Sequence, residues 1–212
     1  MPALYPMFAE LAGRGVLVVG GGSVAARKVR RLLETGARVT VVAPAVCDQV
    51  AELARDGALV LHKRTYEEQD LEGVWLVVTA TDDEELNRTV SEAAVDRRIF
   101  CNVVDQPHLC TFQVPALVRR GMLQVAVSTA GASPALAKRL RRELEERFGP
   151  EYAQLLVSLL ELRRHYQREY EDDPRRRREL LESFLDSGAP ELLLQEDDPD
   201  AFFAEVEKWK SR

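Results

Sequence analysis

The feature that most constrains the fold is a glycine-rich turn between an apolar run and a helical pattern. Residues 15–20 read Gly-Val-Leu-Val-Val-Gly, the pattern of a strand buried on both faces. Residues 20–25 read Gly-Gly-Gly-Ser-Val-Ala and fit the G-x-G-x-x-G/A pattern that binds a dinucleotide. There Gly20 allows the tight turn, Gly22 lets the backbone approach a pyrophosphate, and Ala25 permits close helix packing. A purely structural glycine turn is the alternative, but the strand before it and the helix after it favour a nucleotide site.

Strand and helix patterns alternate through the first half of the chain. Further strands are predicted at 38–43, 59–62, 75–80 and 99–104, and helices at 23–35, 46–56 and 83–96. This alternation is typical of a parallel sheet with right-handed crossovers. Residues 1–113 are therefore predicted to form an α/β domain, a Rossmann-type doubly wound parallel sheet that binds a nucleotide.

The pattern changes after this domain. We predict a helix or turn at 114–120, a strand at 123–127 and an amphipathic helix at 132–148. The remainder, 148–212, is predicted as a small helical C-terminal domain of three helices with heavy charge. Its run Arg175 to Arg178 is interpreted as a solvated helix face, with a specific anion site as the alternative.

Composition excludes several classes of function. The chain has 212 residues and a formal net charge of -6, which argues against non-specific nucleic-acid binding. Cys47, Cys101 and Cys110 lack the spacing of a zinc site or a disulfide framework, so we expect free thiols and no bound metal. The first residues lack the basic and apolar regions of a signal peptide, and no apolar run is long enough for a membrane span, so we expect no leader peptide and a cytoplasmic protein.

Polar residues follow the fourth and fifth predicted strands, where ligands bind in open α/β sheets. Thr81 and Asp82 are predicted to line the cofactor site, and capping of the next helix is the alternative. Asp105 is the only acid between Asp96 and Glu143, and a carboxylate at this edge can carry the proton of a dehydrogenation. A capping role for Asp105 stays open, and His108 is the alternative base.

The end of the second strand lacks the acid that commonly holds the ribose hydroxyls. Ala43-Pro44-Ala45 stand there, so the residues leave the choice between NAD and NADP open. Arg27 and Lys28 are candidate partners of a 2′-phosphate, although their place within the first helix is more typical of surface charges.

A second candidate anion-binding element joins the strand at 123–127 to the next helix. Ser133 is a strong helix N-cap, and Pro134 suits the first helical position. The helix then carries four cations, Lys138, Arg139, Arg141 and Arg142. This combination suits a substrate with several carboxylates. A capped structural helix with solvated cations is the alternative.

Taken together, these segments resemble the precorrin-2 dehydrogenase and sirohydrochlorin ferrochelatase module of siroheme synthase. The matching stretches, which cover about the first 150 residues, are 18–28 around Gly20-Gly21-Gly22, 80–83 (Ala-Thr-Asp-Asp), 99–107 around Asn102-Val103-Val104-Asp105, 125–128, and 132–137 around Ala132-Ser133-Pro134.

The resemblance implies oxidation of precorrin-2 to sirohydrochlorin with NAD, and some members then insert Fe²⁺ to give siroheme. It implies that Asp105 serves both steps. The NAD contacts of the family fall on Ser23, Val24, Pro44 and Ala45, next to Gly20 and Gly22. Tetrapyrrole contacts are expected at Ser128, Thr129 and Ser133. Members are homodimers joined through the segment equivalent to 114–147.

Two features of fused family members concern phosphorylation and an additional domain. In fused members a serine that can be phosphorylated stands where this chain has Thr129, which keeps a hydroxyl, and we do not carry this regulation over to Thr129. A methyltransferase follows the module in fused members, and we expect none here. Two other functions stay open: an NAD-dependent dehydrogenase of another carboxylated small molecule, and a non-enzymatic NAD-sensing module.

Overall fold

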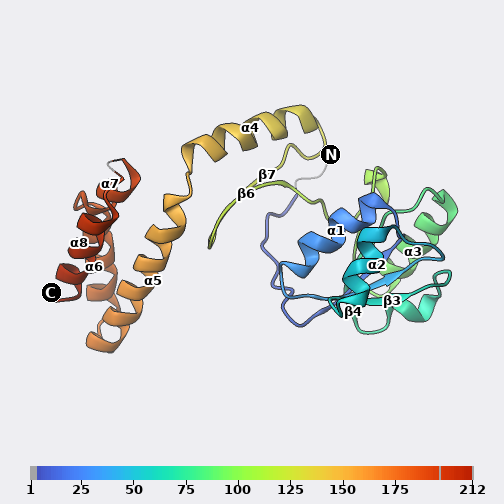
Figure 1. Cartoon of the computed structure of the whole chain (residues 1–212), viewed down its shortest axis with the longest axis horizontal. Coiled ribbons are helices and arrows are strands. Elements are labelled where there is room, and N and C mark those ends of the chain that lie inside the picture. The colour runs from blue at the N-terminus through green and yellow to red at the C-terminus, as the bar shows by residue number, and fades with distance from the viewer. Residues whose placement is uncertain (1–3, 196, 212) are drawn as a thin grey trace. The chain divides into compact units, whose positions relative to one another are not determined.

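The computed structural model describes residues 4–195 and 197–211, which divide into two compact units, 1–114 and 115–212. The first unit holds a parallel five-stranded sheet in the order β3-β2-β1-β4-β5 (Figure 1). Its strands are β1 (Gly15–Val19), β2 (Arg38–Val42), β3 (Val60–His62), β4 (Val74–Thr79) and β5 (Phe100–Val103). The predicted Rossmann-type doubly wound sheet is confirmed.

Helices cover the two faces of this sheet because successive strand residues point to opposite sides. On one face, Val16 and Val18 of β1 pack in a cluster with α1 (Ser23–Leu33) and α2 (Asp48–Arg55). On the other face, Leu17 and Val19 pack with α3 (Glu84–Asp96). The fully apolar strands predicted from the sequence follow from this double coverage.

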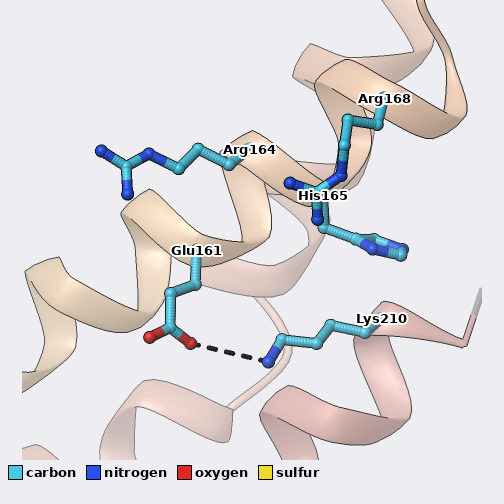
Figure 2. Close-up of a pocket in the computed structure, with 5 residues that line it drawn as sticks. All are labelled: Glu161, Arg164, His165, Arg168 and Lys210. Carbon is cyan, nitrogen blue, oxygen red and sulfur yellow. Dashed lines mark ion pairs between the residues drawn. The ribbon is translucent and has the colours of Figure 1, made fainter.

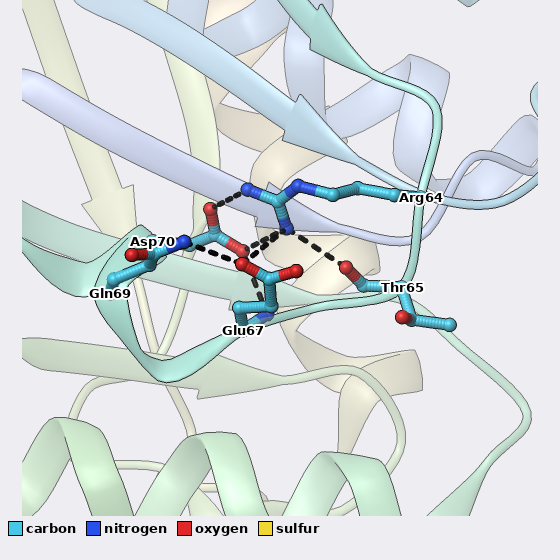
Figure 3. A network of polar contacts seen from close by, with 5 residues as sticks. All are labelled: Arg64, Thr65, Glu67, Gln69 and Asp70. Carbon is cyan, nitrogen blue, oxygen red and sulfur yellow. Dashed lines mark hydrogen bonds and ion pairs between the residues drawn. The ribbon is translucent and has the colours of Figure 1, made fainter.

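Two short 3₁₀ helices complete the first unit: η1 (Glu68–Leu71) before β4 and η2 (Pro107–Leu109) after β5. The loop that leads into η1 is held by a polar network (Figure 3). Arg64 donates to both carboxylate oxygens of Asp70, at 2.9 and 2.6 Å, and to the Thr65 carbonyl. The Glu67 amide also donates to Asp70, and Gln69 donates to Glu67. Asp70 is thus the acceptor on which this turn depends.

The second unit begins with an antiparallel hairpin. Strand β6 (Ala116–Arg120) pairs with β7 (Leu123–Val127), and Gly121, with a φ of +55°, lies in the tight turn between them. The expectation of a helix or turn at 114–120 is therefore wrong for residues 116–120. The cause is the pairing itself, because β6 gains its backbone partners only from β7. Helix α4 (Pro134–Arg147) follows the hairpin.

A helical bundle makes up the rest of the second unit. Its helices are α5 (Glu151–Glu169), α6 (Pro174–Leu185), α7 (Ala189–Leu194) and α8 (Pro199–Lys210). The sequence predicted three helices here, and the structure has four among the described residues. Gly188, with a φ of +79°, ends the continuous helical pattern, and Asp198 caps a new helix that starts at Pro199. The bundle core includes Phe184, Phe202 and Trp209.

The Arg64–Asp70 pair predicts how the first unit responds to acid. The hydrogen bond from Arg64 holds the pKa of Asp70 below its usual value. The pair therefore stabilises the fold above the unfolded-state pKa, about 4, and this contribution is lost as pH falls through the lower folded-state pKa. We expect Asp70→Asn to lower the melting temperature by about 4 °C at pH 7. Thermal unfolding of both proteins should show that the difference in melting temperature shrinks toward pH 2. A difference that is independent of pH would contradict the stabilising role of the Arg64–Asp70 pair.

Candidate dinucleotide site and its catalytic edge

The three consecutive glycines of the first turn face different surroundings. Gly20 has a φ of +117°, and a Cβ there would collide with the Ala80 carbonyl oxygen. A Cβ on Gly21 would collide with the Ala45 carbonyl oxygen and approach Val46 to within 3 Å. Gly22 differs, because a Cβ built there would meet no protein atom within 4 Å. The first two glycines are required by the fold, whereas Gly22 leaves open space beside its backbone.

Helix α1 starts at this open position without a side-chain cap. Gly22 is its N-cap residue, and no side chain accepts a hydrogen bond from the first amides. Ser23 is exposed and Val24 is half-buried. Uncapped amides at a helix N-terminus attract phosphate oxygens, and the missing Cβ lets these oxygens come close. The loop therefore fits the pyrophosphate of a dinucleotide, and Ala25, fully buried, packs α1 closely on the sheet.

The loop after β2 lies directly against the glycine turn. The Cys47 amide donates to the Gly21 carbonyl at 2.8 Å, and Ala45 is the neighbour that excludes a Cβ from Gly21. Pro44 and Ala45 are exposed. This loop thus brings Pro44 and Ala45, which are predicted from the sequence to contact NAD, beside the glycine turn.

Backbone hydrogen bonds place the ends of four strands along one edge. Gly20 donates to Val42, Ala80 to Val19, and Val104 to Thr79, at 2.8 to 3.0 Å. The glycine turn, the loop at Thr81 and the loop at Asp105 therefore follow one another along the carboxyl edge of the sheet, where open α/β proteins bind ligands.

The loop after β4 contains the two predicted site residues, Thr81 and Asp82, and the residue that caps the next helix. Asp83, not Thr81 or Asp82, caps α3, accepting from the amides of Glu85 and Leu86. Thr81 lies next to Gly20, and its hydroxyl accepts from the Asp83 amide. Asp82 is exposed, and its side chain makes no hydrogen bond within the described residues. Thr81 therefore shapes the loop, and Asp82 is available to a ligand.

Asp105 occupies an unusual backbone conformation just past β5. Its φ is +60°, a region that costs a residue with a side chain and that persists where the surrounding structure imposes it. The side chain is exposed and makes no hydrogen bond within the described part of the chain. The N-cap residue of η2 is Gln106, and it has no side-chain cap. The capping interpretation of Asp105 therefore has no hydrogen bond to support it, and the carboxylate is presented to solvent at the binding edge.

Cys110 holds the loop that carries Asp105. Its thiol accepts from the Val103 amide at 3.2 Å, and its single S–H lies within reach of two acceptors, the Val103 carbonyl at 3.2 Å and the Gln106 carbonyl at 3.4 Å. Nearby, Asn102 donates to the Phe112 carbonyl. Burial raises the pKa of Cys110, and it raises that of Cys101 to about 11, so both groups remain thiols at neutral pH. All three cysteines are free.

The candidate substrate residues of the second unit are engaged in local hydrogen bonds. Ser133 caps α4 by accepting from the Leu136 amide at 3.2 Å. The Thr129 hydroxyl accepts from the Ser133 amide and donates to its carbonyl, both at 3.1 Å. The Ser128 hydroxyl accepts from the Ala130 amide. These hydroxyls shape the turn into α4, and a role in substrate binding stays a prediction.

Two features outside the predicted site residues stand out. Lys28, which the sequence leaves open as a 2′-phosphate partner or a surface charge, is half-buried, while its neighbour Arg27 is exposed. An open pocket also lies between α5 and α8, lined by Glu161, Arg164, His165, Arg168 and Lys210 (Figure 2).

The charges of this pocket have a structural explanation. Glu161 pairs with Lys210 at 3.5 Å and joins the two helices, whereas Arg164 points away from that pair (Figure 2). Arg168 and Lys210 lie in the last turns of their helices, where cations offset the helix dipole.

Within residues 4–195 and 197–211, no three His, Cys, Asp or Glu side chains gather as metal ligands would. In the same residues, no helix has the length and apolar character needed to span a bilayer.

Comparisons with known proteins agree with this geometry. Residues 7–116 match a family described as putative NAD(P)-binding, and residues 120–147 match the family described as sirohaem biosynthesis protein central. The structure superposes on SirC, precorrin-2 dehydrogenase, with a TM-score of 0.79 and 33% identity, over 97% of this chain and 100% of that one. The chain belongs to the precorrin-2 dehydrogenase family. The family resemblance inferred from the sequence is confirmed.

Siroheme synthases are similar over most of the chain. The one from Citrobacter koseri is 42% identical over 192 residues, 91% of this chain and 42% of the relative. The one from Thioalkalivibrio sulfidiphilus is 44% identical over 190 residues, 90% of this chain and 39% of the relative. This family member thus spans about two fifths of the length of these relatives.

The contrast between neighbouring glycines yields a prediction. Gly22→Ala should fold as the wild type does but lose at least about tenfold in NAD affinity, because its methyl group fills only the space of the phosphates. Gly21→Ala should instead lower the melting temperature, since its methyl group collides with the Ala45 carbonyl. Calorimetric titration with NAD and thermal unfolding of each variant measure the two effects. If Gly22→Ala binds NAD as tightly as the wild type, the phosphates do not bind at this turn.

Proposed function

We propose that this chain oxidises precorrin-2 to sirohydrochlorin with NAD as hydride acceptor, a step in siroheme formation. The observation that carries the proposal is the carboxyl edge of the sheet. There an open, uncapped glycine turn that fits a dinucleotide shares one edge with the exposed carboxylate of Asp105. The family to which the chain belongs supports the choice of a tetrapyrrole as substrate.

In this proposal one group of residues binds NAD, and Asp105 accepts the proton. Gly20, Gly22, Ser23 and Val24 would hold the pyrophosphate, with Pro44 and Ala45 beside the adenosine and with Thr81 and Asp82 lining the other side. When bound, NAD supplies the hydride acceptor. Asp105 takes the proton that leaves the substrate as the hydride departs, and its exposed position lets it release that proton to water.

The proposal includes insertion of Fe²⁺ into sirohydrochlorin as a second step on the same edge. The macrocycle nitrogens supply the ligands, so the protein has no need of a metal-binding cluster. What it must supply is a base for the protons displaced from those nitrogens, and Asp105 is the exposed carboxylate in place to do this.

We also propose a homodimer formed through residues 114–147. Ala137 is the one buried residue among the fourteen of α4. Leu117, Met122 and Leu136 leave between 39% and 50% of their surface exposed. A two-stranded hairpin with an apolar surface is marginal by itself, and a second copy of the chain would cover these residues. Assembly in the cytoplasm, where thiols stay reduced, suits the free cysteines.

Two other functions would share the glycine turn. A dehydrogenase of another carboxylated molecule would use Asp105 but would not bind a tetrapyrrole, and an NAD sensor would bind NADH without turning over any substrate. Anaerobic incubation with precorrin-2 and NAD⁺, followed by addition of Fe²⁺, separates the proposed function from both alternatives by visible absorbance. An unchanged spectrum after the first addition would refute the proposed dehydrogenation, and one unchanged after the second would refute iron insertion.

The role of Asp105 is tested by Asp105→Asn, which keeps the size and removes the base. We expect NAD affinity to stay within error of the wild type and kcat to fall by at least about 100-fold, the usual worth of a positioned base. His108→Ala, next to it in the same loop, is the matched control and should keep its activity. A fully active Asp105→Asn would take this carboxylate out of the mechanism.

A further inference from the structure

Two polar side chains are buried in the stripe of α3 that faces the core. Asn87 and Ser91 are 2% and 4% exposed, and together with the fully buried Val90 and Ala94 they follow the i, i+3, i+4, i+7 spacing of one helix face. Such a stripe is ordinarily apolar, because a polar group taken out of water costs free energy unless it finds a hydrogen-bond partner. The partners of Asn87 and Ser91 therefore show what these two residues contribute.

Asn87 binds the loop that follows β4. Its Nδ2 donates to the Thr81 carbonyl at 3.0 Å, and its Oδ1 lies 3.2 Å from the Thr81 hydroxyl, whose single O–H is also within 3.3 Å of the Asp83 carbonyl. The Thr81 methyl group in turn lies 3.3 Å from the position that a Cβ on Gly20 would take. Asn87 thus fixes the loop that stands against the glycine turn of the dinucleotide site.

Ser91 binds the loop that follows β5. Its hydroxyl donates to the Leu109 carbonyl at 2.8 Å, a link between residues that are 18 positions apart in the chain. Leu109 belongs to η2 and precedes Cys110, whose thiol lies within hydrogen-bond distance of the backbone on both sides of Asp105. Ser91 thus ties α3 to the segment that carries the candidate carboxylate.

The two contacts reach different loops from a single helix. Residues 87 and 91 are about 6 Å apart along the helix axis, so one element holds both the loop beside the glycine turn and the loop with Asp105. We propose that Asn87 and Ser91 are positioning residues of the dehydrogenase: Asn87 sets the loop at the cofactor, and Ser91 sets where Asp105 stands relative to bound NAD. The inference rests on the proposed function, because it names the residues that hold the two parts of that reaction in place.

The first measurement is NAD⁺ affinity, which needs no turnover. Asn87→Ala should weaken NAD⁺ binding about 10-fold, because the loop at Thr81 loses both of its contacts with the Asn87 side chain, whereas Ser91→Ala should bind NAD⁺ as the wild type does. Asn87→Ser, which is polar but too short to reach both groups of Thr81, gives the same test should Asn87→Ala not fold. Val90→Ala is the matched control: it removes buried volume from the same stripe and no polar group, so it should lower the melting temperature and leave NAD⁺ affinity unchanged.

The second measurement is turnover of precorrin-2 at saturating NAD⁺. Ser91→Ala should lower kcat by about 10- to 100-fold, because a base displaced by about 1 Å transfers the proton poorly, while KM for precorrin-2 should change less. Asn87→Ala should keep kcat within about threefold of the wild type once NAD⁺ is saturating. This opposite division between binding and turnover is what a general loss of stability would not produce, and Val90→Ala should show neither effect.

Amide hydrogen exchange keeps this inference separate from the proposed function. Exchange should become faster at 80–83 in Asn87→Ala and at 104–110 in Ser91→Ala, with the other loop unchanged in each variant. If the wild type does not oxidise precorrin-2, the proposed function fails, and unchanged exchange would overturn the positioning roles independently. If the wild type turns over, unchanged NAD⁺ affinity in Asn87→Ala or unchanged kcat in Ser91→Ala overturns the corresponding role, and equal losses in Val90→Ala overturn both.

Discussion

The close contact of the glycine turn with its neighbouring loops is the constraint on which the binding edge depends. The backbone at Gly20 and Gly21 fills the space where side chains would stand, against the carbonyls of Ala80 and Ala45. This contact locks the ends of β1, β2 and β4 together and leaves the N-terminus of α1 facing outward at Gly22. An anion site made of backbone amides must be rigid to be useful, and here the rigidity comes from contacts that only glycine permits.

The opposite end of the edge is held in a different way. Asp105 adopts a left-handed backbone conformation that is unfavourable for a residue with a side chain, and the Cys110 thiol fixes the carbonyls and amide around it. A buried thiol suits this task because it both donates and accepts while remaining uncharged. The result is a carboxylate with no hydrogen-bond partner among the described residues, at the edge where open α/β sheets bind ligands.

Burial is uneven within the second unit. Its bundle has a complete core around Phe184, Phe202 and Trp209, whereas the hairpin and α4 bury little. Such a contrast within one unit is typical of a chain whose middle segment is completed by another surface. The hydroxyls of Thr129 and Ser133 are meanwhile committed to starting α4, which gives that helix a fixed orientation for any ligand or partner that it meets.

The sequence by itself determined the first unit, because each of its signals is local. An apolar run, a glycine turn and a helical period identify β1 and α1, and their repetition requires a parallel sheet with Asp105 at the edge of Gly20 and Gly22. Motifs in the same order also identified the family. The sequence prediction missed the pairing of β6 with β7, although only two residues separate these strands, because residues 114–120 were assigned to a helix or turn. It also predicted three helices for a tail that has four among the described residues. Only the three-dimensional structure decided that Asp83 is the cap of α3, while Asp82 makes no hydrogen bond among the described residues, and that Lys28 is half-buried. The cap depends on the backbone path of a short loop, and the burial of Lys28 depends on how α1 packs in the unit; the sequence pattern records neither.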